Sequence, residues 1–206
     1  MTFSLFIICC FENSIWQFIT FTPPKNSNLM KSEKICIMGL GYIGLPIAAL
    51  LATKGYKVLG VDVKSEVVDK VNKGLVHIAE PELDTFMKSA VQSGNLTASM
   101  TPEPADIFII AVQTPVDKNN QPDITRVVDA VTAIAPLIRQ DNLLIIESTC
   151  PVGTTEKMAA LLREKGINTD DIQIAFSSER VVPGQTIREL MQNDRVVGGI
   201  TTEAAL

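Results

Sequence analysis

The chain has 206 residues, enough for one sizeable domain with a buried core or for one domain with appendages. Its net charge is −5 and its charged residues are interspersed without basic runs, which argues against a nucleic-acid or membrane-surface partner and favours a small molecule. The four cysteines lack C-x-x-C spacing and there is a single histidine, so we expect a reduced, cytoplasmic chain without a disulfide framework or a metal site.

The first 29 residues differ in composition from the rest of the chain. They are rich in aromatic side chains, but only Glu12 and Lys25 carry charge. The apolar run over residues 3–11 stops well short of the ~20 residues of a membrane span, and no positive charge precedes it as in a secretory signal. We expect Met30 to be the natural start, residues 1–29 to be an extension outside the fold, and residues 30–206 to form the domain. The alternative is a hydrophobic anchor.

The domain begins with an apolar segment, residues 34–38, that leads directly into a G-x-G-x-x-G pattern and a predicted helix over residues 42–53. Gly39 would permit a tight turn, Gly41 would let the backbone approach a pyrophosphate, and Gly44 would let the helix pack closely on its strand. The diphosphate would then lie at the N-terminus of that helix. An ordinary glycine-rich turn is the alternative.

An acidic residue follows the glycine pattern at the expected distance. Asp62 ends the second predicted strand, residues 57–62, and lies 18 residues beyond Gly44. A carboxylate there would accept hydrogen bonds from the adenosine ribose hydroxyls and repel a 2′-phosphate, so the sequence predicts NAD rather than NADP as the cofactor. The alternative is an aspartate that caps the next helix.

Helices and strands alternate along the rest of the chain. Further helices are predicted over residues 65–72, 81–93, 123–138, 154–165 and 187–193, and further strands over residues 96–99, 105–112, 143–146, 172–176 and 195–200. Asp123 is expected to be an N-cap, and Pro136 to end the regular part of its helix early. The alternation predicts an α/β fold, a Rossmann-like doubly wound parallel sheet with right-handed crossovers.

Ligands of such sheets bind beyond the carboxyl ends of the strands. Four polar strand ends should meet there, namely the glycine turn of residues 39–44, Asp62, Thr114 with Pro115, and residues 147–149. We therefore expect these segments to line one dinucleotide crevice. Cys150, which has no neighbouring histidine or stabilising charge, is expected to be a small packed side chain.

Several motifs occur in one order: GLGYIGLP, VDV, a Thr-Pro after the fourth strand, ESTCPVGTTEKM, and SSERVVPGQ followed by NDRVVGG. Together they resemble the N-terminal half of the UDP-glucose/GDP-mannose dehydrogenase family from about Lys34 to Ile200. The segment Glu-Arg-Val-x-Pro-Gly resembles the branch that oxidises UDP-N-acetylhexosamines rather than the glucose-oxidising branch. This favours UDP-N-acetyl-D-mannosamine as the substrate, with the glucosamine or galactosamine epimers as alternatives.

The resemblance implies that the family oxidises C6 of a nucleotide sugar from alcohol through aldehyde to acid, using two NAD. It implies backbone contacts of Tyr42 and Ile43 to the pyrophosphate, and a contact of Asp62 to the ribose. Thr114 and Thr149 would line the nicotinamide side, with the Thr149 hydroxyl near the reacting centre, where it could orient a water or a substrate oxygen.

Three residues after the sixth strand also match family positions. Glu179 matches a carboxylate linked to the aldehyde-to-acid half-reaction, a base or a group that positions water. Arg180 and Val181 would meet the sugar nucleotide, with Arg180 able to bind a phosphate or sugar oxygen. The plainer alternatives are that Thr149 only ends a strand and that Glu179 and Arg180 form a solvated pair.

The resemblance further implies parts that these 206 residues do not contain. The family has a thiol nucleophile in a C-terminal UDP-binding domain, and a lysine and an asparagine in a helical middle region that also forms the dimer. The sequence stops before both, so we expect an NAD-binding fragment of a homodimeric enzyme with little turnover on its own. The alternatives are a non-catalytic NAD-binding module, or a dehydrogenase for another UDP-hexose such as UDP-glucose.

Overall fold

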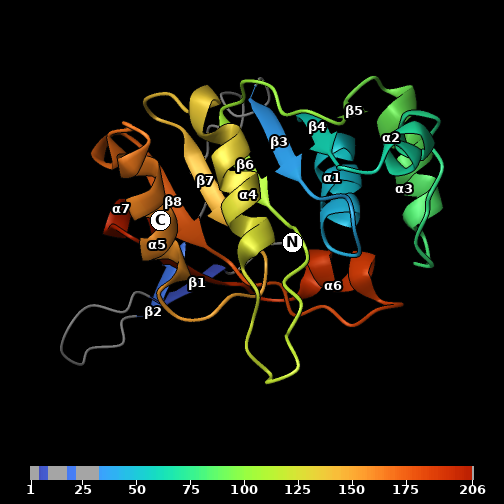
Figure 1. Cartoon of the computed structure of the whole chain (residues 1–206). Coiled ribbons are helices and arrows are strands. Elements are labelled where there is room, and N and C mark those ends of the chain that lie inside the picture. The colour runs from blue at the N-terminus through green and yellow to red at the C-terminus, as the bar shows by residue number, and fades with distance from the viewer. Residues whose placement is uncertain (1–4, 9–17, 22–32, 206) are drawn as a thin grey trace.

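The computed structural model describes residues 5–8, 18–21 and 33–205, and it shows one central sheet with helices on both faces (Figure 1). The strands of the main part are β3 (Lys34–Met38), β4 (Lys57–Val61), β5 (Leu96–Ser99), β6 (Ile107–Ile110), β7 (Leu143–Ile146), β8 (Gln173–Phe176) and β9 (Val196–Gly199). The helices are α1 (Gly44–Thr53), α2 (Ser65–Asn72), α3 (Leu83–Gln92), α4 (Thr125–Ile134), α5 (Thr154–Glu164), α6 (Thr186–Gln192) and α7 (Thr202–Ala205), with short 3₁₀ helices η2 (Ala135–Leu137) and η3 (Thr169–Asp171).

Six strands pair in parallel in the order β5-β4-β3-β6-β7-β8. This is the doubly wound order in which the chain starts at the centre, builds one half outward through β4 and β5, and returns to build the other half from β6. The predicted fold is confirmed. The strand order reverses between β3 and β6, where such sheets bind their ligands beyond the carboxyl ends.

The two faces of the sheet belong to two buried clusters, and the alternation of side chains along a strand divides β3 between them. Ile35 and Ile37 pack with the apolar residues of α1, α2, α3 and α6, while Cys36 and Met38 pack with those of α4 and α5. A strand covered on both faces has to be apolar throughout, which explains the continuous apolar runs of β3, β6 and β7.

The predicted helices and strands of residues 33–205 are all present, with ends shifted by a few residues. The helix predicted to begin at Asp123 is α4, whose N-cap is Ile124 instead. Asp123 lies one residue earlier, where its Oδ1 accepts a hydrogen bond from the Thr125 amide at 2.9 Å. Pro136 does end the regular part of this helix early, because it lies in η2.

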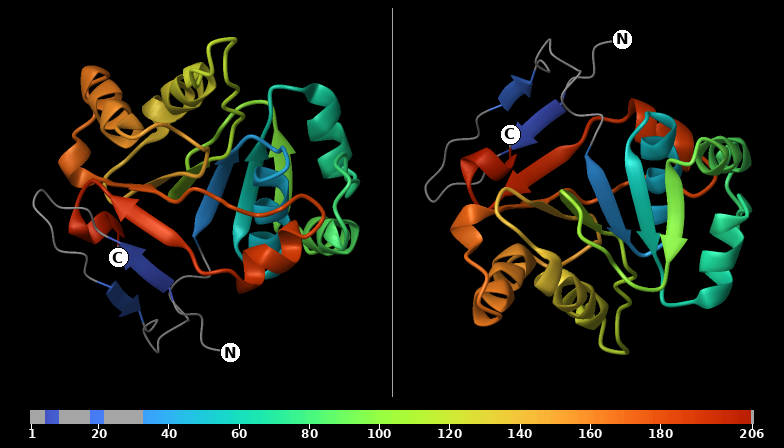
Figure 2. Two further views of the ribbon diagram at one scale, coloured as in Figure 1. Left: turned by 90° about the horizontal axis from the view of Figure 1, so that it is seen from below. Right: turned by 90° about the horizontal axis from the view of Figure 1, so that it is seen from above.

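The last strand departs from the parallel prediction. β9 pairs antiparallel with β8. The helix before it, α6, lies at the end of the sheet toward which β3 points, next to α1 (Figures 1 and 2). Between β8 and β9 the chain therefore does not return to the amino ends of the strands, and it enters β9 from the carboxyl edge.

Two short strands of the N-terminal extension are described, β1 (Leu5–Ile8) and β2 (Phe18–Phe21). They pair antiparallel with each other, and β1 pairs parallel with β9. The rest of residues 1–29 lies outside the described residues, so the expectation that this extension is no part of the fold stays a prediction. Within the described ranges, no helix is long and apolar enough to cross a membrane.

Asn72, the last residue of α2, closes the outer edge of β5. Its Nδ2 donates to Ala98 O at 2.9 Å, and Ala98 N donates to its Oδ1 at 2.8 Å, so one amide side chain replaces a neighbouring strand. We expect Asn72→Ala to lower the free energy of unfolding by about 1 kcal/mol, measured by urea denaturation, because two backbone groups lose their partners. The control is Asn119→Ala in an exposed loop, and an equal effect of both substitutions would contradict this.

Candidate functional site

The turn after β3 leaves no room for side chains at two of its three glycines. Gly39 has a φ of +98°, and a Cβ there would lie 2.6 Å from the carbonyl oxygen of Ala111 at the end of β6. A Cβ on Gly44 would lie 1.8 Å from Gly39 O. A Cβ on Gly41, in contrast, would meet no atom within 4 Å. Gly39 and Gly44 are therefore required by packing, whereas Gly41 faces open space that fits an approaching pyrophosphate.

The turn also presents the start of a helix. Leu45 N donates to Gly41 O at 3.1 Å, so the helical hydrogen bonds of α1 begin just after the predicted pyrophosphate contacts Tyr42 and Ile43. Ile43 is the N-cap of α1 and supplies no side-chain cap, and Tyr42 is 52% exposed. Backbone N–H groups at such a helix start are suited to bind an anion.

Asp62 lies beside this turn, as the sequence predicted for a ribose-binding carboxylate. Its Oδ2 accepts a hydrogen bond from Leu40 N at 3.1 Å, and Gly39 N donates to Val61 O at 2.7 Å. Its Oδ1 accepts from Lys64 N at 3.0 Å, so Asp62 also fixes the segment that leads into α2. Asp62 therefore lies next to the glycine turn, as a ribose-binding carboxylate would, and it also binds the segment before α2.

Thr114 and Thr149 come from the loops after two neighbouring strands and are in contact. Thr114 Oγ1 donates to Thr149 O at 2.7 Å. Ser148 Oγ donates to Val112 O at 2.8 Å, and this second link holds the ends of β6 and β7 together. Because Gly39 approaches Ala111 at the end of β6, the two threonines lie on the same edge of the sheet as the glycine turn.

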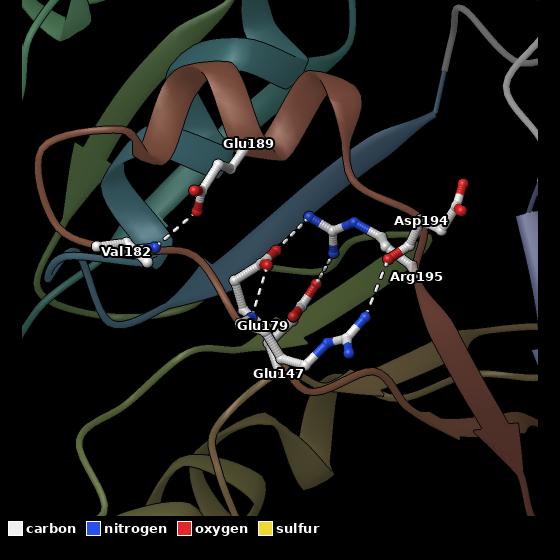
Figure 3. Close-up of polar contacts among 7 residues, drawn as sticks. Glu147, Glu179, Val182, Glu189, Asp194 and Arg195 are labelled. Carbon is white, nitrogen blue, oxygen red and sulfur yellow. Dashed lines mark hydrogen bonds and ion pairs between the residues drawn. The ribbon is translucent and has the colours of Figure 1, made fainter.

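Arg195, which precedes β9, forms ion pairs with two buried carboxylates (Figure 3). Its Nη1 lies 2.7 Å from Glu147 Oε1 at the end of β7, and its Nη2 lies 2.5 Å from Glu179 Oε2 after β8. The side chains of Glu147 and Glu179 are only 6% and 7% exposed. We call these three residues the glutamate–arginine cluster. The cluster joins the loops that follow β7 and β8.

Arg195 forms ion pairs with two carboxylates, and the pKa of Glu147 is affected by both of these charges. Burial raises the pKa of Glu147 to about 7, the attraction of Arg195 opposes that rise, and the repulsion of Glu179 adds to it. Its Oε2 is buried and, among the described residues, has no hydrogen-bond partner. A proton on Oε2 would leave Oε1 free to keep its bond from Arg195.

The structure does not place Glu179 and Arg180 in a solvated pair. Glu179 is buried, and its Oε1 accepts from the backbone N of Arg180 at 2.8 Å, not from the guanidinium. The exposed Arg180 side chain reaches the other way and donates to Asp194 O at 3.3 Å. Val181 is partly buried against the cluster that contains α1. A cavity of about 460 Å³ lies beside these residues and is lined by Ser178, Glu179, Arg180, Gln192, Asn193, Asp194 and Arg195.

Cys150 follows Thr149 and is partly buried, in keeping with the small packed side chain that was expected. It lies against the apolar cluster beneath α4 and α5. Burial raises the pKa of its thiol, which disfavours the thiolate that a nucleophile requires.

Sequence reasoning assigned no role to Arg195, and it treated Glu147 only as a polar strand end. The one signal was the NDRVVGG motif behind SSERVVPGQ, which places an arginine at the first residue of the strand predicted over residues 195–200. The partners lie 16 and 48 residues away, so the spacing alone could not identify them.

Comparison with known proteins matches residues 33–206 to the UDP-glucose/GDP-mannose dehydrogenase family, NAD binding domain. The chain belongs to this family. Over 183 residues, 84% of its length, it is 48% identical to a UDP-N-acetyl-D-mannosamine dehydrogenase of Campylobacter jejuni, covering 45% of that protein. It is 44% identical to an NDP-N-acetyl-D-galactosaminuronic acid dehydrogenase of Ralstonia solanacearum, with 81% of this chain and 42% of the relative aligned.

Solved structures agree with the match. The UDP-N-acetyl-mannosamine dehydrogenase of Staphylococcus aureus superposes with a TM-score of 0.78 at 38% identity, over 84% of this chain and 42% of that one. The corresponding enzyme of Pyrococcus horikoshii gives a TM-score of 0.80 at 41% identity, over 83% and 42%. The chain thus spans less than half the length of these relatives and corresponds to their NAD-binding part, so the expected cofactor NAD is confirmed for the family domain.

Two glycine substitutions should separate the packing of the turn from its ligand contact. Gly44→Ala puts a Cβ 1.8 Å from Gly39 O, so we expect it to lower the free energy of unfolding by at least about 2 kcal/mol. Gly41→Ala meets no protein atom within 4 Å, so it should leave unfolding by urea nearly unchanged and weaken NAD binding in calorimetric titration. Full NAD affinity in Gly41→Ala would contradict a close contact between the backbone at Gly41 and the pyrophosphate.

The raised pKa of Glu147 predicts a dependence of stability on pH. A carboxyl group whose pKa rises from 4.5 to about 7 on folding stabilises the folded state fully below pH 4.5, and it loses that contribution as the pH rises through 7. Replacing Glu147 with Gln removes the titration and keeps an oxygen for Arg195. We expect the stability of the wild type relative to Glu147→Gln to fall by on the order of 1–3 kcal/mol between about pH 4 and pH 8.

Urea denaturation at several pH values measures this difference. Glu156→Gln on the first turn of α5 is the control, and its free energy of unfolding should depend on pH in the same way as that of the wild type. Parallel pH profiles of the wild type and Glu147→Gln would show that Glu147 does not titrate in this range.

Proposed function

We propose that the chain is the NAD-binding part of a nucleotide-sugar 6-dehydrogenase that oxidises UDP-N-acetyl-D-mannosamine to UDP-N-acetyl-D-mannosaminuronate with two NAD. One observation carries the proposal. The glycine turn with Asp62, the Thr114–Thr149 pair and buried Glu179 all follow parallel strands at the same edge of one sheet. Cofactor groups and reaction groups would therefore face one crevice.

The residues around the turn fit NAD. Gly41 faces open space where a backbone can approach the pyrophosphate, and Tyr42 and Ile43 precede the first helical hydrogen bond of α1. Asp62 would accept hydrogen bonds from the adenosine ribose hydroxyls, and its charge would repel the 2′-phosphate of NADP. Thr114 and Thr149 would line the nicotinamide side. Bound NAD supplies the acceptor for hydride from C6 of the sugar.

The chain's own groups would handle protons and water. The exposed Thr149 would orient a water or a substrate oxygen by a hydrogen bond from its hydroxyl. Glu179 would position water or accept its proton in the aldehyde-to-acid half. The ion pair with Arg195 holds the Glu179 carboxylate in one direction, which is what a positioning group requires.

Two residues and the names of the relatives support the choice of substrate. Arg180 is exposed beside the cavity next to Glu179, and it would bind a phosphate or a sugar oxygen of the substrate. Val181 would add a contact from the same loop. Relatives at 44–48% identity carry the names of N-acetylhexosamine or N-acetylhexosaminuronate dehydrogenases, and these names favour an N-acetylated sugar over UDP-glucose.

Some groups that the reaction needs would come from outside these residues. The resemblance places the thiol nucleophile, the lysine and the dimer-forming helices in later parts of the family's polypeptide. The 206 residues alone should therefore bind NAD with little turnover, and the complete enzyme would be a cytoplasmic homodimer.

Calorimetric titration with NAD tests the proposal on this chain. Asp62→Ala should weaken NAD binding by about 1–3 kcal/mol, on the order of 5- to 150-fold in Kd, because charge-assisted hydrogen bonds to the ribose are lost. Wild-type chain should also bind NAD more tightly than NADP. The control is Asp69→Ala, an exposed aspartate of α2 with the same charge change.

Circular dichroism and urea denaturation verify that each variant is folded, since Asp62 also holds Leu40 N and Lys64 N. Equal affinity of a folded Asp62→Ala chain, or a folded wild type that does not bind NAD, would overturn the assignment. Steady NADH production from wild type and UDP-N-acetyl-D-mannosamine would contradict the expected inactivity.

A further inference from the structure

The loop that carries Glu179 and Arg180 runs from β8 to α6 over residues 177–185, and carboxylates hold its backbone. Val182 N donates to Glu189 Oε2 at 2.7 Å, which is a local contact within the same segment. Gly184 N donates to Glu80 Oε2 at 2.9 Å, and Thr186 N donates to Glu80 Oε1 at 2.6 Å. Both carboxylate oxygens of Glu80, a residue remote in sequence, therefore bind the backbone at the junction between the loop and α6.

Glu80 comes from a different part of the molecule. It lies between α2 and α3, in the half of the fold that contains Asp62, and 104 and 106 residues separate it from its two partners. The residue is only 8% exposed. A buried carboxylate is costly unless it is hydrogen-bonded, and here two N–H groups satisfy it. The N-cap residue of α6, Gln185, supplies no side-chain cap, so Glu80 takes that place.

The loop is thus fixed at two points. At its start, Glu179 is bound to Arg195, and at its end Gly184, five residues later, is bound to Glu80. Between them Val181 packs toward the cluster that contains α1. A loop this short, held at both ends, has little freedom. Releasing Gly184 should therefore change where Glu179 lies relative to Arg195.

We propose that Glu80 is a positioning residue, which holds Gly184 and Thr186 so that the loop presents Glu179 and Arg180 at the carboxyl edge of the sheet. The identity of the substrate that the loop meets rests on the proposed function, whereas the positioning itself does not. If Glu80 were only a cap that stabilises α6, its loss would disturb the helix start and leave the distant Arg195 unchanged.

Nuclear magnetic resonance of the 206-residue chain separates the two roles. Glu80→Ala removes both acceptors, and Glu80→Gln keeps one of them and nearly the same volume. We expect the amides of Gly184 and Thr186 to exchange with solvent at least about tenfold faster in Glu80→Ala, with Glu80→Gln between it and the wild type. We also expect the guanidinium N–H signals of Arg195, identified by their loss in Arg195→Lys, to shift or broaden.

Glu66→Ala is the control, because it removes one exposed carboxylate from α2 and should reproduce the wild-type spectrum. Unchanged Arg195 signals beside faster exchange of Gly184 and Thr186 would reduce Glu80 to a helix cap, and unchanged exchange would show that its two bonds are not kept in solution. Either result overturns the proposal. If Glu80→Ala does not fold, Glu80→Gln decides by the same signals.

Titration of the wild type with NAD is read separately from these spectra. Failure to bind NAD would contradict the proposed function. The positioning role of Glu80 would still be decided by the amide exchange and by the Arg195 signals.

Discussion

The turn after β3 closely approaches the end of β6, and the arrangement of the whole carboxyl edge of the sheet depends on this contact. Gly39 adopts a left-handed backbone with its Cα against the Ala111 carbonyl, and Gly44 places α1 directly over Gly39. Only this packing lets α1 start immediately beyond the carboxyl end of β3, so that its first amides face the point where the strand order reverses. The bond from Leu40 to Asp62 then brings the end of β4 to the same place.

A second constraint acts on the other half of the edge and is electrostatic. One ion pair near a protein surface gains about 4 kcal/mol at 4 Å, whereas burying each carboxylate costs several kcal/mol. Arg195 carries a single positive charge for the two carboxylates that it contacts. Glu147, whose Oε2 has no partner in the described part of the chain, is the one whose pKa rises to about 7. A proton taken up there leaves Arg195 and Glu179 as a matched pair.

The sequence predicted the features that are local or that recur along every parallel strand. The spacing of Gly39, Gly44 and Asp62 is short, and a single strand, turn and helix fix its meaning. The contacts that join distant segments could not be read in this way. Arg195 finds Glu147 across 48 residues and Glu80 finds Gly184 across 104, and both pairings depend on where α6 lies. The sequence pattern also could not indicate that β9 runs antiparallel, because that too follows from the place of α6 at the carboxyl edge.

The same contacts favour a dehydrogenase over a module that only binds NAD. A binding module needs the glycine turn and Asp62, and it gains nothing from two buried carboxylates that share one arginine, an arrangement that lowers stability at neutral pH. Groups with perturbed pKa values cluster at functional sites, although structural ion-pair networks perturb pKa values as well. Here Glu147 lies at the end of β7, two residues before Thr149, and Glu179 lies on the loop that Glu80 ties to the half of the fold containing Asp62. The loop that a simple cofactor binder would not need is thus held both by the ion pair of Glu179 with Arg195 and by the hydrogen bonds to Glu80.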